Sequence, residues 1–222
     1  MIQKYSQTQA RTDITQIARL CYERRYICGM EGNFSIRLEE NLILTTPAGV
    51  CKGRMSEDDL VLVDLTGAPK NSRHKRPSTE LKMHLTVYQN RPDVKACVHA
   101  HPTYAVGFSV AGVDLNQYIL PEVVVTLGKI PVAPYATPST DEVSNSIASL
   151  VIEHDSLILD HHGALTYGGD LWDAYYKLET IEHHAQTLYV AHTLGKVNTL
   201  GESEISKLMK TCSVYGLPQP KL

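Results

Sequence analysis

The order of apolar runs along the chain is the feature that most constrains its fold. Short runs with strand-like alternation, such as 33–38 and 94–101, are separated by longer segments with helical spacing, such as 171–194. No internal repeat, low-complexity tract or linker interrupts this order. A chain of 222 residues can bury a substantial core without disulfides or a metal. We therefore expect a single α/β domain over residues 1–222, with helices flanking a sheet.

Individual elements can be assigned from the spacing of apolar residues and from turn residues. A helix is expected over residues 7–28 with Gly29 as its stop, and Ser78 is a suitable N-cap for a helix that ends before Pro92. Strands are expected at 33–38, 41–45, 60–64, 94–101, 123–127, 131–134 and 156–160, and further helices at 140–154, 171–194 and 202–213. Most residues with reactive side chains stand where these elements begin or end.

The composition excludes several classes of protein. With 21 Lys and Arg against 24 Asp and Glu, the net charge is −3, which gives no basic field for nucleic acid or membrane lipid. The apolar content of 43% excludes disorder, and no run approaches the length of a membrane span. The first residues lack the apolar core of a signal peptide, and the five scattered cysteines form no C-x-x-C pair. We expect a cytoplasmic protein with reduced thiols that binds neither nucleic acid nor membrane.

The motif H-A-H at 99–101 stands at the end of an expected strand. Residues two apart project from the same face of a strand, so the imidazoles of His99 and His101 can converge on one ion. A second expected strand ends in D-H-H-G at 160–163, where His162 offers a third imidazole and alternation turns His161 away. Three neutral imidazoles with an open fourth position are typical of a catalytic zinc site. The alternative is that these histidines are surface residues.

The segment P-S-T-E at 77–80 precedes an expected helix. A helix start presents unpaired N–H groups, and here two hydroxyls as well, so it is a natural seat for a phosphate. Glu80 would lie in the first turn, next to whatever binds there; the alternative is an ordinary cap with a favourable acid. The turns at 32–33 and 47–49 could also bring backbone N–H groups to an anion, or could be turns alone.

The other histidines favour structural roles. His84 follows Glu80 by four residues and could ligate a metal from the same helix face, but its position favours a place beside the core. His183 and His184 lie in the middle of a long expected helix, where a surface pair of His183 with Glu179 is expected.

Together these motifs resemble the class II aldolase/adducin family, and within it the L-fuculose-1-phosphate aldolase branch. The resemblance covers nearly the whole chain, from 32–35 to 215–217. Its most specific parts are the segments 77–80, 98–101, 130–135 and 161–163, whose order and spacing are together highly specific. The resemblance implies a three-layer α/β/α sandwich with a mainly antiparallel central sheet.

The resemblance also implies roles for individual residues. The zinc ligands would be His99, His101 and His162, with Glu80 as the acid/base residue and a fourth ligand in the resting enzyme. The phosphate cradle would fall on Gly32, Asn33, Gly49, Ser78 and Thr79. Tyr215 matches the tail tyrosine that family aldolases use around the aldehyde. One zinc ion per subunit, or another divalent metal, is implied.

The implied reaction is reversible cleavage of a ketose 1-phosphate into dihydroxyacetone phosphate and an aldehyde. The metal would stabilise the enediolate charge, Glu80 would move the proton at carbon and Tyr215 the proton at the aldehyde oxygen. Family members are typically homotetramers with active sites at subunit junctions, so the same assembly is implied here.

Departures from the family pattern concern the side of the site that would receive the aldehyde. Ala48 stands where aldolases of this branch have Thr or Ser, and one hydroxyl contact is lost. Leu120 stands where the family has a tyrosine near the aldehyde, with Tyr118 two residues away and Pro121-Glu122 next to it. These departures leave a fuculose-1-phosphate-like substrate open beside one with a more apolar aldehyde fragment, such as a deoxy or methylthio pentulose 1-phosphate.

Some alternative functions fit these residues less well than an aldolase does, and others fit them equally well. The sister epimerase has aspartates at the positions of Glu80 and Val124, so both positions argue against it. Dehydratases and decarboxylases of the superfamily share the three histidines and stay open. A non-enzymatic adducin-like module should have lost the ligands, and a structural zinc site would favour cysteine. We therefore expect a metal-dependent lyase.

Overall fold

The structure, a computed structural model, describes residues 5–70, 75–214, 219–220 and 222. Within this part of the chain, strands join into one mixed sheet of seven. They are β1 Asn33–Glu39, β2 Leu42–Thr45, β3 Val61–Val63, β4 Ala96–Ala100, β5 Val132–Ala133, β6 Ser156–Leu159 and β7 Gly163–Gly168. The order across the sheet is β3-β2-β1-β4-β7-β6-β5, and only the β5–β6 pair is parallel. The expected α/β class with a mainly antiparallel sheet is confirmed.

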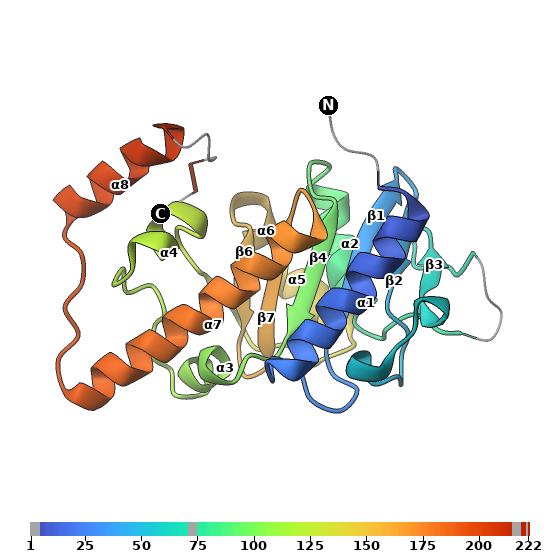
Figure 1. Ribbon diagram of the computed structural model, residues 1–222, viewed down its shortest axis with the longest axis horizontal. Coiled ribbons are helices and arrows are strands. Elements are labelled where there is room, and N and C mark those ends of the chain that lie inside the picture. Colours follow the sequence, from blue (N-terminus) through green and yellow to red (C-terminus); the bar gives the residue numbers. More distant parts are fainter. Residues whose placement is uncertain (1–4, 71–74, 215–218, 221) are drawn as a thin grey trace.

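The described residues also form helices. They are α1 Gln7–Glu23, α2 Leu81–Asn90, α3 Thr103–Val110, α4 Pro121–Thr126, α5 Asp141–Ile147, α6 Leu150–Glu153, α7 Leu171–Leu194 and α8 Glu202–Val214, with short 3-10 turns η1 Lys52–Arg54 and η2 Glu57–Asp59. In Figure 1, α1 and α7 cross in front of the sheet, α2 and α5 lie behind it, and α8 lies beside α4 at one end.

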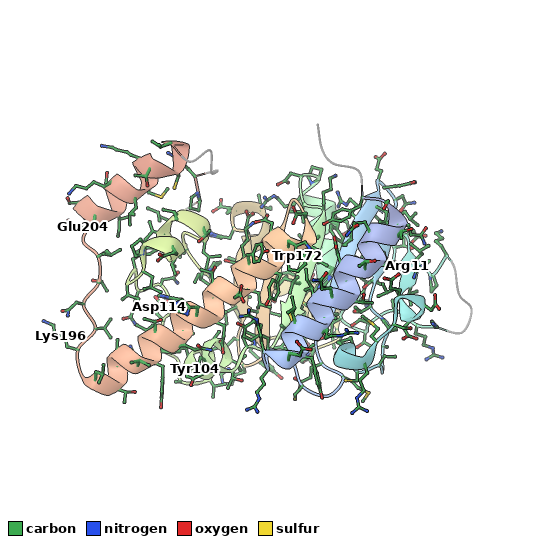
Figure 2. All side chains as sticks on the ribbon, in the orientation of Figure 1. Arg11, Tyr104, Asp114, Trp172, Lys196 and Glu204 are labelled. Carbon is green, nitrogen blue, oxygen red and sulfur yellow. The ribbon has the colours of Figure 1, made fainter. Side chains whose placement is uncertain are left out.

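Alternation along the central strands divides the core between the two faces. In β4, Val98 belongs to the apolar cluster with α1 and α7, whereas its neighbour Cys97 belongs to the cluster with α2 and α5. Both β4 and β7 are buried along their whole length. Side chains fill the space between α1, α7 and the sheet, with Trp172 in the first turn of α7 packing against Tyr175 (Figure 2). The central strands are thus rigid supports for the residues at their ends.

Some expected elements differ in the structure. The first helix ends at Glu23 rather than at residue 28, because Arg25 takes a left-handed conformation with φ 61°. The strand expected at 123–127 is wrong: residues 121–126 form helix α4, with Pro121 at its first turn and Gly128 after its end. The expected helix at 140–154 is divided into α5 and α6.

Two elements were not expected at all: the central strand β7 and helix α3. The α7 bounds agree with the expected 171–194 helix. Within the described residues, no helix is long and apolar enough to cross a membrane.

Candidate active site

Three histidines and one glutamate meet at the end of strand β4. His99 is the fourth residue of β4 and is fully buried, and His101 follows the strand. His162 lies in the turn between β6 and β7, which the antiparallel β4–β7 pairing brings beside His101. Glu80 stands at the N-cap of α2. One ligand atom from each of these four residues lies within 4.8 Å of the others, so the group could hold a metal ion.

Hydrogen bonds fix which ring nitrogens face inward. Nδ1 of His99 lies 2.9 Å from the carbonyl oxygen of Ala164. A carbonyl only accepts, so Nδ1 donates its proton and Nε2 keeps its lone pair. Nδ1 of His101 lies 3.3 Å from a carboxylate oxygen of Glu31, which favours the same tautomer. The Nε2 atoms of His99 and His101 then face each other at 3.0 Å.

The surroundings keep the imidazoles of His99 and His101 neutral and the carboxyl of Glu80 ionised. Burial lowers the pKa of His99 well below its usual value and also lowers that of His101. Burial acts to raise the pKa of Glu80, but the hydrogen bond to His162 and the neighbouring imidazoles hold it at about 2. The carboxylate oxygens of Glu80 lie 3.0 Å from Nε2 of His162 and 3.5 Å from Nε2 of His99. At neutral pH the group thus contains the carboxylate of Glu80 and the neutral rings of His99 and His101.

This donor set fits a divalent cation. The Nε2 atoms of His99 and His101 lie 3.0 Å apart with their lone pairs facing inward. These lone pairs repel each other unless a positive charge lies between them. Neutral imidazoles and a carboxylate are the ligands that zinc takes in catalytic sites. No cysteine belongs to the group, which argues against a closed structural site. The four residues that the sequence suggests as metal ligands thus lie together in the structure.

Asn33 and Gly32 border the metal group on the β1 side. The Asn33 amide donates to a carboxylate oxygen of Glu80 at 3.2 Å. Its Oδ1 is buried and, among the described residues, has no hydrogen-bond partner, so it is available to a ligand hydroxyl. Gly32 has φ +71°, and an added Cβ would lie 2.6 Å from Ile27 Cγ2 and 3.0 Å from the His99 carbonyl oxygen. Only glycine fits this close approach.

The other three residues expected to hold phosphate lie on two adjacent segments. Gly49 is in a left-handed turn with φ +70°, and nothing lies within 4 Å of an added Cβ. Backbone bonds from Ala48 N to Arg76 O and from Ser78 N to Thr46 O tie this turn to the 76–80 segment. Ser78 is not the N-cap of α2; its Oγ accepts from the Glu80 N–H, while Thr79 is exposed. The structure thus brings the expected cradle segments together beside Glu80.

The residues expected near an aldehyde are less well defined. Tyr215 lies outside the described residues. Leu120 and Tyr118 are half-buried before α4, and Val124 is fully buried inside that helix. Burial and the charge of Asp114 raise the pKa of Tyr118.

Two residues beside the site were missed by sequence reasoning. Glu31 contacts His101, and nothing in its local sequence pattern distinguishes it from a surface acid. Lys52 is buried, and its ammonium donates to the carbonyls of Met30 at 3.0 Å and Val50 at 2.8 Å. Lys52 therefore connects the loop before Gly32 to the turn at Gly49. Burial lowers its pKa.

Three further polar side chains, in α2 and α7, are buried and make hydrogen bonds. His84 is fully buried, as its expected place beside the core requires, and its Nδ1 lies 2.8 Å from Ser35 Oγ. His184 is also buried, and its Nε2 lies 2.8 Å from the Leu115 carbonyl oxygen. Glu182 of α7 accepts the backbone N–H groups of Tyr104 and Ala105, which fixes the start of α3 just after His101; Tyr104 is labelled in Figure 2.

The chain is similar over most of its length to known proteins. The family model described as Class II Aldolase and Adducin N-terminal domain matches residues 12–189. An L-fuculose phosphate aldolase from Methanococcus maripaludis is 36% identical over 183 residues, which cover 82% of this chain and 98% of that protein. A 3-oxo-tetronate 4-phosphate decarboxylase from Pectobacterium atrosepticum is 32% identical over 209 residues, covering 91% of this chain and 94% of that protein.

Solved structures share the fold. L-fuculose-1-phosphate aldolase from Thermus thermophilus superposes with a TM-score of 0.75 at 30% identity, covering 87% of this chain and all of that chain. The similar proteins are thus named for two different reactions.

Proposed function

Because the chain belongs to the class II aldolase and adducin family, we propose that it is a metal-dependent lyase that cleaves a carbon–carbon bond of a phosphorylated sugar. The family expected from the sequence is confirmed. The observation that carries the proposal is the group of Glu80, His99, His101 and His162, with ligand atoms within 4.8 Å beside two glycine turns.

The first candidate reaction is cleavage of a ketose 1-phosphate to dihydroxyacetone phosphate and an aldehyde. The phosphate would bind the backbone and hydroxyl groups at Gly32, Asn33, Gly49, Ser78 and Thr79. A divalent ion bound at the histidines supplies a Lewis acid that stabilises the negative charge left by bond cleavage. Glu80, ionised at neutral pH, would first take up a proton from water and then deliver it to the three-carbon fragment; in the synthetic direction the carboxylate would remove that proton.

Tyr215, outside the described residues, is proposed to exchange the proton of the aldehyde oxygen, as the family resemblance implies. Both a fuculose-1-phosphate-like ketose and a deoxy or methylthio pentulose 1-phosphate stay candidates. The apolar side chain of Leu120 supports the latter.

The second candidate reaction is decarboxylation of a 3-oxo sugar-acid phosphate, which the decarboxylase relative with 91% coverage of this chain supports. In both reactions, the bond that breaks joins the carbon adjacent to a ketone to the group that leaves. Both reactions therefore leave the same three-carbon carbanion, which is then protonated. They differ only in the leaving electrophile, which is an aldehyde in one and carbon dioxide in the other. The same ligands and the same acid/base residue would therefore serve either reaction.

The deciding experiment separates the leaving groups. The purified chain, with its metal per chain measured, would be given fuculose 1-phosphate, methylthioribulose 1-phosphate and 3-oxo-tetronate 4-phosphate. Aldehyde and carbon dioxide would be quantified alongside dihydroxyacetone phosphate, because that product alone does not distinguish the reactions. Aldehyde release that a chelator stops supports the aldolase, and carbon dioxide release supports the decarboxylase. Neither product from any substrate, with metal bound, would contradict both.

Glu80→Gln tests the proposed acid/base residue. The amide cannot take up the proton, so we expect carbon–proton exchange of dihydroxyacetone phosphate to fall by about 10²–10⁴-fold while metal stays bound through the histidines. Exchange of solvent deuterium would be followed by NMR, with metal content measured on the same samples. Glu40→Gln, an exposed acid after β1, is the matched control and should exchange at the wild-type rate. Unchanged exchange in Glu80→Gln would remove Glu80 from this role.

Finer features are proposed on the strength of the family. We propose zinc as the metal, one ion per subunit, and a homotetramer with active sites at subunit interfaces, acting in the cytoplasm on a small-molecule substrate. The two apolar clusters on opposite faces of the sheet support a three-layer α/β/α arrangement, and the family match over residues 12–189 supports one domain spanning 1–222.

A further inference from the structure

Glu31 lies in the loop that leads from α1 into β1, between the left-handed glycines Gly29 and Gly32. Its Oε2 accepts from the backbone N–H of Cys28 at 3.2 Å and lies 3.4 Å from the Cys28 thiol. The Glu31 N–H in turn donates to the Cys28 carbonyl at 3.0 Å. The carboxylate therefore has a fixed position within its own loop.

The same carboxylate oxygen lies 3.3 Å from Nδ1 of His101, the ring nitrogen that faces away from the metal group. The loop also holds the backbone of this histidine, since the His101 N–H donates to the Tyr26 carbonyl at 2.8 Å. His101 is the ligand that follows β4 rather than lying in it, so the ladder does not hold it as it holds His99. The loop before β1 holds His101 instead, through the Tyr26 carbonyl at its backbone and through Glu31 at its ring.

We propose that Glu31 is a positioning residue for the metal: its carboxylate accepts the Nδ1 proton of His101 and so holds Nε2 of that ring toward the ion. Carboxylate–histidine–metal arrangements of this kind orient the ring and raise the basicity of the ligating nitrogen. His99 has a backbone carbonyl in the equivalent place, from Ala164. The inference rests on the proposed function only in assuming that the four-residue group binds a metal.

A carboxylate in this position also changes the charge of the site. Glu31 adds a second negative charge beside the one on Glu80, and a divalent ion neutralises both. Its side chain is 42% exposed, so solvent screens the charge, and acceptance of the Nδ1 proton of His101 would be the larger contribution. Removal of the carboxylate should therefore weaken metal binding without unfolding the chain.

The test measures zinc affinity directly, with no substrate present. We expect Glu31→Ala to raise the dissociation constant for zinc by about 10–100-fold, determined by competition with a chromogenic chelator. Glu31→Gln retains an acceptor for the Nδ1 proton without the charge, and should recover a large part of the affinity. Glu40→Ala removes an exposed acid that follows the far end of β1 and is the matched control, with affinity unchanged.

A double-mutant cycle shows whether Glu31 acts through His101. In a His101→Ala background, where zinc is held by the remaining ligands, adding Glu31→Ala should change the dissociation constant by less than about twofold. Cobalt substitution gives a spectroscopic check, because a misplaced ring in Glu31→Ala should alter the visible ligand-field bands that Glu40→Ala leaves intact. Circular dichroism confirms that each variant is folded.

Two results would overturn the inference. One is an unchanged zinc affinity in a folded Glu31→Ala variant. The other is an equal loss of affinity in the wild-type and His101→Ala backgrounds, which would mean that Glu31 acts through its charge alone. A wild-type chain that binds zinc in a Glu31-dependent way but cleaves none of the sugar phosphates would contradict the proposed reaction and leave the role of Glu31 intact.

Discussion

Gly163 follows the candidate ligand His162 and leaves no space for a side chain. A Cβ at this position would lie 2.5 Å from the Ala100 carbonyl oxygen, 2.7 Å from Cδ2 of His101 and 3.0 Å from Cε1 of His99. Backbone and two ligand rings would have to move. We expect Gly163→Ala to cost about 1–3 kcal/mol of unfolding free energy and about tenfold or more in zinc affinity. Denaturant titration and chelator competition measure the two effects.

Gly169→Ala is the control for this substitution, because nothing lies within 4 Å of an added Cβ there. It should leave both quantities close to their wild-type values. A Gly163→Ala variant with wild-type zinc affinity would show that the rings of His99 and His101 can move without loss of the metal.

His84 connects the site to the pH dependence of stability. Burial lowers its pKa to about 3, and the charge of Glu80 only partly opposes this. The unfolded chain has the ordinary value of about 6.5, so below that pH the unfolded state takes up a proton that the folded state does not. His84 therefore does not reduce the free energy of unfolding above about pH 7, and reduces it progressively as the pH falls below that value. Between pH 7 and pH 5 the expected loss is about 2 kcal/mol.

His84→Gln tests this linkage in metal-free protein. The variant should be less stable at pH 7, because the contact with Ser35 is altered, and its unfolding free energy should fall less between pH 7 and pH 5 than that of the wild type. Urea titrations at several pH values give both curves. Parallel curves for the two proteins would show that His84 does not contribute to the pH dependence.

The end of α1 shows what apolar spacing leaves undetermined at the scale of an element. The spacing and Gly29 indicate a helix to residue 28, yet the helix stops at Glu23 because the Tyr26 N–H bonds the Cys21 carbonyl at 2.8 Å. This closing turn requires a left-handed residue, and Arg25 fills a place that usually favours glycine. A local sequence pattern does not reveal a cap made by an unfavourable residue.

Arg25→Gly should therefore stabilise the protein. Glycine removes the strain of φ 61° but loses more entropy on folding, and we expect a net gain of about 0.5–1 kcal/mol. Arg25→Ala retains the Cβ and should give no such gain, which separates backbone strain from loss of the arginine charge. Thermal unfolding in the presence of chelator measures both. A gain of equal size in the alanine variant would contradict the strain argument.

Helix α4 and strand β7 show two further limits of predicting elements from local sequence patterns. Residues Val123, Val124 and Val125 favour a strand, but two of them are buried in a short helix against α7 and α8, so tertiary packing overrides the local preference. The signals that could have identified the helix are Pro121 at its first turn and Gly128 after its last. Strand β7 has six residues and begins and ends with glycine, and its pairing with β4 and β6 makes it a central strand.

For the whole molecule, the sequence determines more about the site than about the path of the chain. The metal group could be predicted because His99 and His101 are two residues apart at the end of a strand, and because the motif at 161–163 supplies a third ring. Contacts between residues distant in sequence could not be predicted, because no periodicity connects Glu31 to His101 or Lys52 to Met30. These supporting contacts depend on how the loops close over the sheet.

The four candidate ligands come from segments that only the folded chain brings together: the start of α2, strand β4, the residue after it, and the β6–β7 turn. A metal that binds this arrangement and not the unfolded chain stabilises the fold by mass action, by about 2.7 kcal/mol at a free concentration 100 times its dissociation constant. For a chain of 222 residues this corresponds to a rise in unfolding midpoint of about 5–10 °C. Differential scanning calorimetry with zinc and then with chelator would measure it, and His99→Ala, which lacks a buried ligand, should show a much smaller shift at the same zinc concentration. A wild-type midpoint that zinc and chelator leave unchanged would mean that the three histidines and Glu80 do not form a metal site.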